Sequence, residues 1–175
     1  MCAEMNGGEQ SHTFAVLVEN KFGVLAKVAS LFSARGYNID SLSVGVTQDP
    51  SISRITLVTR GDEPILEQIR KQLSKLIDTI KVMDLEEGES VHREMALIKV
   101  NAPQAKRAEV LQLAGIFRGR IIDVSANTFI IEVTGDEGKI SAFLELLRPL
   151  GIKEIVRTGK IAMIRGPKTL RGAKN

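Results

Sequence analysis

Cysteine, histidine and tryptophan are nearly absent from this chain of 175 residues, which has one cysteine, two histidines and no tryptophan. The single cysteine, Cys2, excludes an intramolecular disulfide and any metal site that needs two cysteines. The chain also lacks the motifs of serine hydrolases, zinc proteases and nucleotide-binding loops. We therefore expect no catalytic residue, no metal site and no cofactor bound by this chain. A binding role is favoured over catalysis.

Long hydrophobic runs are absent as well. No stretch approaches the ~18 consecutive apolar residues of a membrane span, and residues 1–10 lack the apolar core of a secretory signal. The hydrophobic fraction of 43% is nevertheless ordinary for a folded protein. These features predict a globular cytoplasmic protein that has no membrane partner.

Acidic residues are missing from the C-terminal end. Residues 155–175 contain six lysines and arginines and no acid, in a chain whose net charge is +3. Such a segment can contact nucleic acid or an acidic partner, or it can be a solvated end of the chain. Aromatic side chains that would stack on single-stranded bases do not accompany these charges. We favour a solvated basic tail, at residues 167–175, and expect no nucleic-acid partner.

A periodic pattern begins at Thr13. Alternating apolar residues predict strands, and apolar residues spaced by three and four predict helices. Gly36 is placed to end the first helix, and Asp62 with Pro64 is placed to begin the second. The predicted elements are a strand at 13–19, a helix at 24–35, strands at 39–46 and 52–59, a helix at 62–76 and a strand at 80–85. This order, βαββαβ, is that of a ferredoxin-like fold.

The same order begins again after a polar linker at residues 87–91. A strand at 95–100 and a helix at 104–117 precede turns that match those of the first half, although the second hairpin is shorter. The match is either an internal repeat or a chance likeness of two halves of one fold class. We expect an α+β protein made of two ferredoxin-like βαββαβ domains. The predicted division is a disordered extension at 1–11, a first domain at 12–86, the linker at 87–91, a second domain at 92–166 and the tail at 167–175.

The turn between the first strand and the first helix is the strongest candidate for a binding site. The free amides at a helix start attract a carboxylate, and Gly23 allows a ligand to approach them closely. Asn20 offers a donor and an acceptor that could orient an amino acid. The alternative is that Asn20 and Gly23 only shape the turn. Their spacing alone does not decide between these roles.

The motifs of both halves resemble one family. Residues 20–25, with the pattern N-x-x-G-x-L, resemble the signature of ACT domains, which are βαββαβ modules that bind amino acids as feedback effectors. Residues 31–42, 93–100 and 116–124 resemble the regulatory (small) subunit of acetolactate synthase, also called acetohydroxyacid synthase. The resemblance covers about residues 12–166, so the first domain is expected to be an ACT domain.

The resemblance implies a non-catalytic partner of an acetolactate synthase catalytic (large) subunit. The large subunit of this family holds thiamine diphosphate, Mg²⁺ and FAD, and the small subunit activates it and confers inhibition by valine, sometimes by isoleucine or leucine. The family also implies a homodimer or higher oligomer with the effector at the interface. The implied effector-binding residues are Asn20, Gly23, Val24 and Leu25 of one chain and Asn38 and Ile39 of its neighbour.

The sequence departs from the family pattern in few places. Residues 1–11 have no match in the family, and Phe22 occupies the position before the glycine, at which the family varies. In the second half, the corresponding turn is Asn101-Ala102-Pro103, which lacks the glycine. An effector site in the second half is therefore not expected. Two other functions stay open: a generic ACT-type amino-acid sensor that acts on another enzyme, and a small enzyme that uses Asp40 or Asp123.

Overall fold

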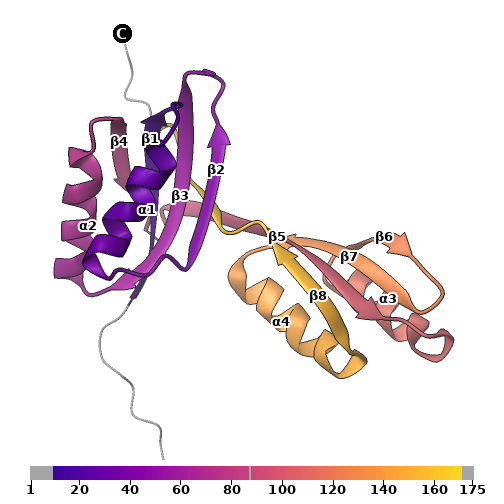
Figure 1. The fold of residues 1–175 in the computed structure, drawn as a ribbon. Helices are drawn as coiled ribbons and strands as arrows, with labels where there is room; N and C mark the ends of the chain where they lie inside the picture. The colour runs from indigo at the N-terminus through magenta and orange to yellow at the C-terminus, as the bar shows by residue number, and fades with distance from the viewer. Residues whose placement is uncertain (1–9, 87, 171–175) are drawn as a thin grey trace, which may run out of the picture. The chain divides into compact units, whose positions relative to one another are not determined.

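The computed structural model describes residues 10–86 and 88–170 of the chain. The chain forms two compact units: the first contains the residues up to Val91 together with those from Lys160 on, and the second contains His92–Gly159. Each unit has the order βαββαβ, with two helices and an antiparallel sheet (Figure 1). The predicted α+β class with two ferredoxin-like units is confirmed.

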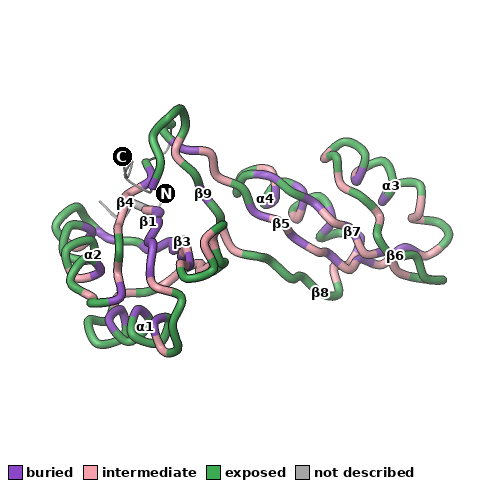
Figure 2. The backbone as a smooth tube through the Cα atoms, turned by 90° about the horizontal axis from the view of Figure 1, so that it is seen from above, coloured by how far each residue is buried: buried purple, intermediate pink, exposed green. Residues whose placement is uncertain are grey.

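The four main strands of the first unit lie in the order β2-β3-β1-β4. Both helices cover one face of this sheet (Figure 1). Strand β1 is buried along most of its length (Figure 2), and Phe14, Val16 and Val18 pack in the core with the helices. The elements of the first unit are β1 (Gln10–Glu19), α1 (Val24–Arg35), β2 (Ser41–Val46), β3 (Ile52–Gly61), α2 (Glu63–Lys75) and β4 (Thr79–Asp84).

Local sequence signals set the ends of the helices. Gly36 ends α1 in the left-handed conformation, with φ 69°, and its amide donates back to a carbonyl of the last turn. The carboxylate of Asp62 accepts a hydrogen bond of 3.0 Å from the amide of Ile65 and so caps the start of α2. The predicted end of α1 and the predicted start of α2 are both confirmed to within one or two residues.

The second unit repeats this architecture around a core of its own. Its strands lie in the order β6-β7-β5-β8, and Ile98, Val110 and Phe143 are fully buried. Asp136 caps α4 as Asp62 caps α2, with a hydrogen bond of 2.8 Å from the amide of Lys139. The elements are β5 (Ser90–Asn101), α3 (Arg107–Ile116), β6 (Arg120–Val124), β7 (Thr128–Gly135), α4 (Glu137–Leu147) and β8 (Ile152–Arg157), with short 3-10 helices at Gln104–Lys106 and Arg148–Leu150.

The two copies differ where the first helix of each ends. In the second unit the left-handed residue is Arg118, with φ 53°, and not the glycine that follows it. Gly119 is needed for close approach instead, because a Cβ there would lie 3.1 Å from Ile131 and 3.2 Å from a backbone oxygen of β7. Arg118-Gly119 follows the first helix of the second unit as Arg35-Gly36 ends that of the first, but the left-handed position is one residue earlier in the second pair.

The C-terminal segment belongs to the first unit, which differs from the predicted second domain at 92–166 and tail at 167–175. Its strand β9 (Ile161–Ile164) and Leu170 cover the face of the first sheet that the helices leave open. Ala162 and Leu170 are each 6% exposed there, in a cluster with Ala15, Leu17 and Leu85. The apolar alternation of residues 161–164 predicts a strand but does not say which unit it joins.

The other predicted boundaries shift by a few residues. Strand β1 begins at Gln10, inside the extension predicted at 1–11, and the rest of that extension lies outside the described residues. Within the predicted linker at 87–91, Ser90 and Val91 already belong to β5, and residue 87 is not described. Residues 171–175 of the predicted tail also lie outside the described part of the chain.

Candidate functional site

The turn after β1 brings Asn20 and Gly23 to the start of α1, as the sequence predicts. The side-chain amide of Asn20 donates a hydrogen bond of 2.8 Å to the carbonyl of Pro50, and its backbone amide donates to the carbonyl of Ser51. These bonds join the turn to the loop between β2 and β3. Asn20 thus has a structural role, and its side-chain carbonyl oxygen remains an acceptor that a ligand could use.

Gly23 is the residue at which α1 begins. It adopts φ 83°, which strains residues with a side chain, and no side chain caps the helix at this end. A Cβ built on Gly23 would have no atom within 4 Å, so the space around it is open. The first amides of α1 carry a partial positive charge. A carboxylate could reach them here without displacing a capping side chain.

The basic side chains around this turn are already paired. Lys21 contacts Glu19 at 2.5 Å, and this hydrogen bond, with the attraction of the carboxylate, raises the pKa of Lys21. Lys27 contacts the nearly buried Asp78 at 2.5 Å. A carboxylate bound at this turn would therefore depend mainly on backbone amides.

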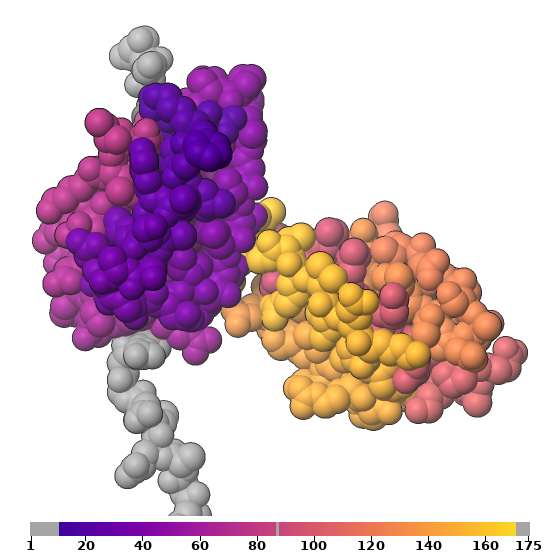
Figure 3. All heavy atoms as spheres, viewed as in Figure 1, coloured from indigo at the N-terminus to yellow at the C-terminus, as the bar shows by residue number. Residues whose placement is uncertain are grey.

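The apolar residues of the turn point in different directions. Val24 is 5% exposed and packs in the core, so that only its backbone could meet a ligand. Leu25 is 43% exposed and Phe22 is fully exposed. The turn and α1 lie at the surface of the first unit (Figure 3). Leu25 and Phe22 therefore offer an apolar surface beside the open helix start.

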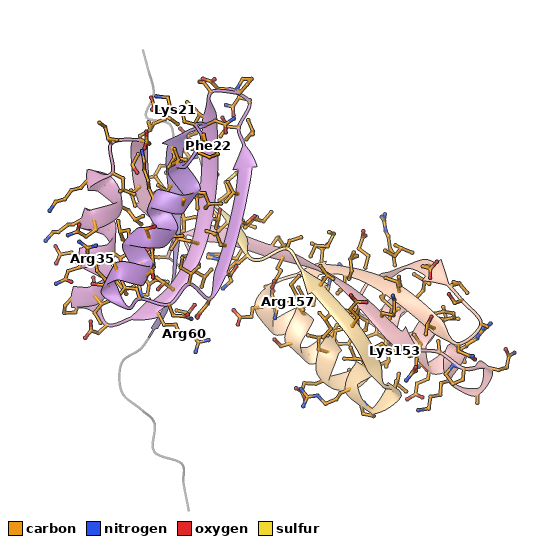
Figure 4. The ribbon with its side chains drawn as sticks, in the orientation of Figure 1. Lys21, Phe22, Arg35, Arg60, Lys153 and Arg157 are labelled. Atoms are coloured by element: carbon orange, nitrogen blue, oxygen red, sulfur yellow. The ribbon has the colours of Figure 1, made fainter. Side chains whose placement is uncertain are left out.

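Asn38 and Ile39 lie at the other end of α1. The helix has 12 residues, which is about 18 Å at the usual rise. Lys21 and Phe22 are seen at one end of it, and Arg35 and Arg60 near the other (Figure 4). One chain therefore does not bring its own Asn38 to its own Gly23, and a small ligand could contact both only if two copies contribute.

The loop that carries Asn38 is held by polar contacts. The side-chain amide of Asn38 donates to Asp40 at 2.5 Å, and Asp40 pairs with Arg60 at 2.7 Å. The backbone carbonyl of Asn38 accepts a hydrogen bond from Thr59. Ile39 is partly buried against the core. Asp40 is thus a structural carboxylate here, which weakens the reading of it as a catalytic group.

Comparison with known proteins identifies the family. Residues 14–81 match the model of the ACT domain of the small subunit of acetohydroxyacid synthase (AHAS), and residues 93–166 match that of the small subunit of acetolactate synthase. The chain belongs to the acetolactate synthase small-subunit family. This is the family of regulatory subunits that the motifs indicate.

Relatives match this small subunit over nearly its whole length. A probable acetolactate synthase small subunit of Archaeoglobus fulgidus is 60% identical over 90% of this chain and 98% of its own. The small subunit of Mycolicibacterium smegmatis is 47% identical over 97% of this chain and all of its own. The crystal structure of the small subunit of Thermotoga maritima, 45% identical, superposes with a TM-score of 0.84 over 91% of this chain and 99% of that one.

Sequence reasoning missed the contacts made by the C-terminal segment. The hydroxyl of Ser41 accepts a hydrogen bond from the amide of Lys160, and Arg54 donates to the carbonyl of Ala162. Ser41 lies inside the family motif at residues 31–42, but no local pattern connects Ser41 or Arg54 with residues 108 or more positions away. None of the helices in the described residues is long and apolar enough to cross a membrane.

Proposed function

We propose that this small subunit activates the catalytic subunit of acetolactate synthase and makes it sensitive to feedback inhibition by valine or another branched-chain amino acid. The observation that carries the proposal is the match of both units to models of this one family. Thiamine diphosphate, Mg²⁺ and FAD would all be held by the catalytic subunit. The complex would act in the cytoplasm, in branched-chain amino-acid biosynthesis.

The proposed effector site combines two copies of the chain. The amino acid's carboxylate would accept hydrogen bonds from the first amides of α1, next to Gly23. Its aliphatic side chain would lie against Leu25, with Asn38 and Ile39 of a second copy closing the site. One methylene changes binding by only ~1–3 kcal/mol. Valine, leucine and isoleucine are therefore expected to compete for the same site with graded affinity.

The second copy would pair along the edge strand β2 and the outer side of α1. Val44 and Val46 are 46% and 60% exposed on this edge strand, and Leu25 is exposed on α1. An edge strand with exposed apolar residues is a template for pairing with another chain. A twofold dimer would bury these residues and would create two equivalent effector sites.

The second unit would dock on the catalytic subunit. Its family motif at residues 116–124 includes three large apolar side chains that are more than half exposed: Ile116, Ile122 and Val124. Exposed apolar residues at the end of α3 and on the edge strand β6 are typical of an interaction surface. In this proposal the second unit activates the catalytic subunit, and the first unit binds the effector.

The experiment that tests the proposal is reconstitution. The chain is purified with an acetolactate synthase catalytic subunit, and acetolactate formation is followed as valine, leucine or isoleucine is added. We expect co-purification, a higher rate with the small subunit and inhibition by at least one of the three amino acids. An ACT-type sensor of another enzyme, the alternative function, would bind an amino acid without raising the rate of this catalytic subunit.

A further inference from the structure

Ser41 joins the predicted effector-site loop to the segment that returns from the second unit. It is the first residue of β2 and follows directly on Asn38, Ile39 and Asp40. Its hydroxyl oxygen accepts a hydrogen bond of 2.9 Å from the backbone amide of Lys160. Lys160 is the first residue after the second unit, which ends at Gly159. One hydrogen bond therefore spans two positions separated by 119 residues in the chain.

Beyond Lys160 the returning segment is fixed to the first unit. The guanidinium of Arg54 donates to the carbonyl of Ala162 at 2.5 Å, and the amide of Arg165 donates to the carbonyl of Glu89 at 2.8 Å. Burial of its guanidinium lowers the pKa of Arg54. Ala162 and Leu170 are buried in the apolar cluster on this sheet face. Because the segment is anchored, a displacement of Ser41 would not be absorbed by a loose end.

The residues before Gly159 are fixed just as firmly within the second unit. Arg157 makes two hydrogen bonds to the carboxylate of Glu94, which is 7% exposed, and this pairing raises the pKa of Arg157. Thr158 exchanges hydrogen bonds with the backbone of Met95. Gly159, with φ 80°, lies between these two anchored stretches. A movement of Lys160 would thus be taken up by the backbone at Gly159.

We propose that Ser41 is a positioning residue that transmits effector binding from the loop at 38–40 to the returning segment at 160–170. This rests on the proposed function, since it needs an effector that contacts Asn38 and Ile39. A ligand shifts a conformational equilibrium only if it binds two states unequally. In this proposal the two states differ in the position of the loop, and the Ser41–Lys160 bond makes Lys160, at the start of the returning segment, follow the loop. Ser41 itself does not touch the effector.

The test separates effector binding from inhibition. Ser41→Ala removes the acceptor, and Ser41→Thr keeps a hydroxyl at that position. Ser43→Ala is the matched control, because Ser43 lies two residues along the same strand and its hydroxyl has no hydrogen-bond partner within the described part of the chain. Valine affinity is measured calorimetrically on each full-length small subunit. Inhibition by valine is measured on the reconstituted enzyme.

For Ser41→Ala we expect a valine Kd within about twofold of the natural chain, unchanged activation, and less than half of the natural inhibition at saturating valine. Ser41→Thr and Ser43→Ala should be inhibited as the natural chain is. The exchange rate of the Lys160 amide should rise about fivefold or more in Ser41→Ala alone, as expected for a lost hydrogen bond of ordinary strength.

Two results would overturn the inference. In the first, Ser41→Ala binds valine and is inhibited like the natural chain, which leaves the proposed function intact. In the second, its inhibition falls only as far as its valine affinity falls, which makes Ser41 part of the binding site. If the natural chain neither binds nor responds to valine, leucine or isoleucine, the proposed function fails and the inference fails with it.

Discussion

At the scale of single residues, the start of α1 has no capping side chain, and neither has the start of α3. Most helices begin with a side chain that accepts hydrogen bonds from the first amides, as Asp62 and Asp136 do for α2 and α4. Gly23 leaves these amides without such an acceptor and has a positive φ and open space around it. An uncapped helix start loses some stability, and we propose that this one offers a place for the carboxylate of an effector.

Gly23→Asp should therefore weaken the response to valine. The new carboxylate would occupy the helix start and repel the carboxylate of the effector, so the inhibitory valine concentration should rise about tenfold or more. Activation of the catalytic subunit should be nearly unchanged. The left-handed backbone also costs about 1–2 kcal/mol with a side chain, which urea unfolding would show.

Gly88→Asp is the control for this variant. Gly88 has φ 99° and no atom within 4 Å of a built Cβ, so it takes the same strain and charge away from the helix start. It should keep the natural valine sensitivity. Equal valine sensitivity in Gly23→Asp and Gly88→Asp, measured by steady-state rates of the reconstituted enzyme, would show that Gly23 only shapes the turn.

At the scale of elements, the sequence predicts what is local and misses what depends on distant packing. The βαββαβ order, the ending of α1 at Gly36 and the capping of α2 by Asp62 follow from short patterns, and the structure confirms them. The sequence does not predict to which unit β9 belongs, because the alternation of residues 161–164 would be the same on either sheet. The exchange of roles between Arg118 and Gly119 depends on contact with β7.

The packing of β9 on the first sheet can be tested with two adjacent residues. Ala162 is 6% exposed and Met163 is 64% exposed, since successive residues of a strand face opposite sides. Ala162→Asp would bury an unpaired charge against Ala15 and Leu17 and should lower the free energy of unfolding by about 3 kcal/mol or more. Met163→Asp should change it by less than about 0.5 kcal/mol.

Urea unfolding of the two variants measures this difference. Similar stability of Ala162→Asp and the natural chain would mean that the returning segment does not pack on the first sheet. The same packing has a consequence for fragments. A piece that ends near Glu89 lacks the cover of this sheet face, so it should be less stable than the first unit in the full chain.

At the scale of the whole molecule, the candidate site is divided between two places that one chain keeps apart. The sequence predicts both parts from motifs, and the resemblance assigns them to two chains. The structure adds that the parts lie at opposite ends of a helix about 18 Å long. It also adds that Val24 packs in the core. That burial could be predicted from the apolar stripe of the helix, which includes Val24 and Val28.

The interface can be tested through its edge strand. Sedimentation of the natural chain at micromolar concentration should give at least a dimer. Val46→Glu places a charge on the exposed edge at β2 and should shift the population toward monomer without unfolding the chain. Ile80→Glu is the control, because Ile80 is 51% exposed on β4, at the opposite edge of the same sheet. A dimer unaffected by Val46→Glu would place the interface elsewhere.

Mixed dimers test most directly whether two chains share each effector site. Gly23→Asp and Asn38→Ala should each weaken valine binding, the second by about tenfold through lost hydrogen bonds. In a dimer of one Gly23→Asp chain and one Asn38→Ala chain, one site contains both substituted residues. The other site contains the natural Gly23 of one chain and the natural Asn38 of the other. Random mixing should then restore natural affinity to roughly one quarter of all sites.

The measurement is a calorimetric titration of valine into each variant alone and into the two variants unfolded and refolded together. We expect the mixture to contain a class of sites with natural affinity that neither variant shows alone. A mixture that binds only as weakly as its components would contradict it, because each chain would then hold its own complete site.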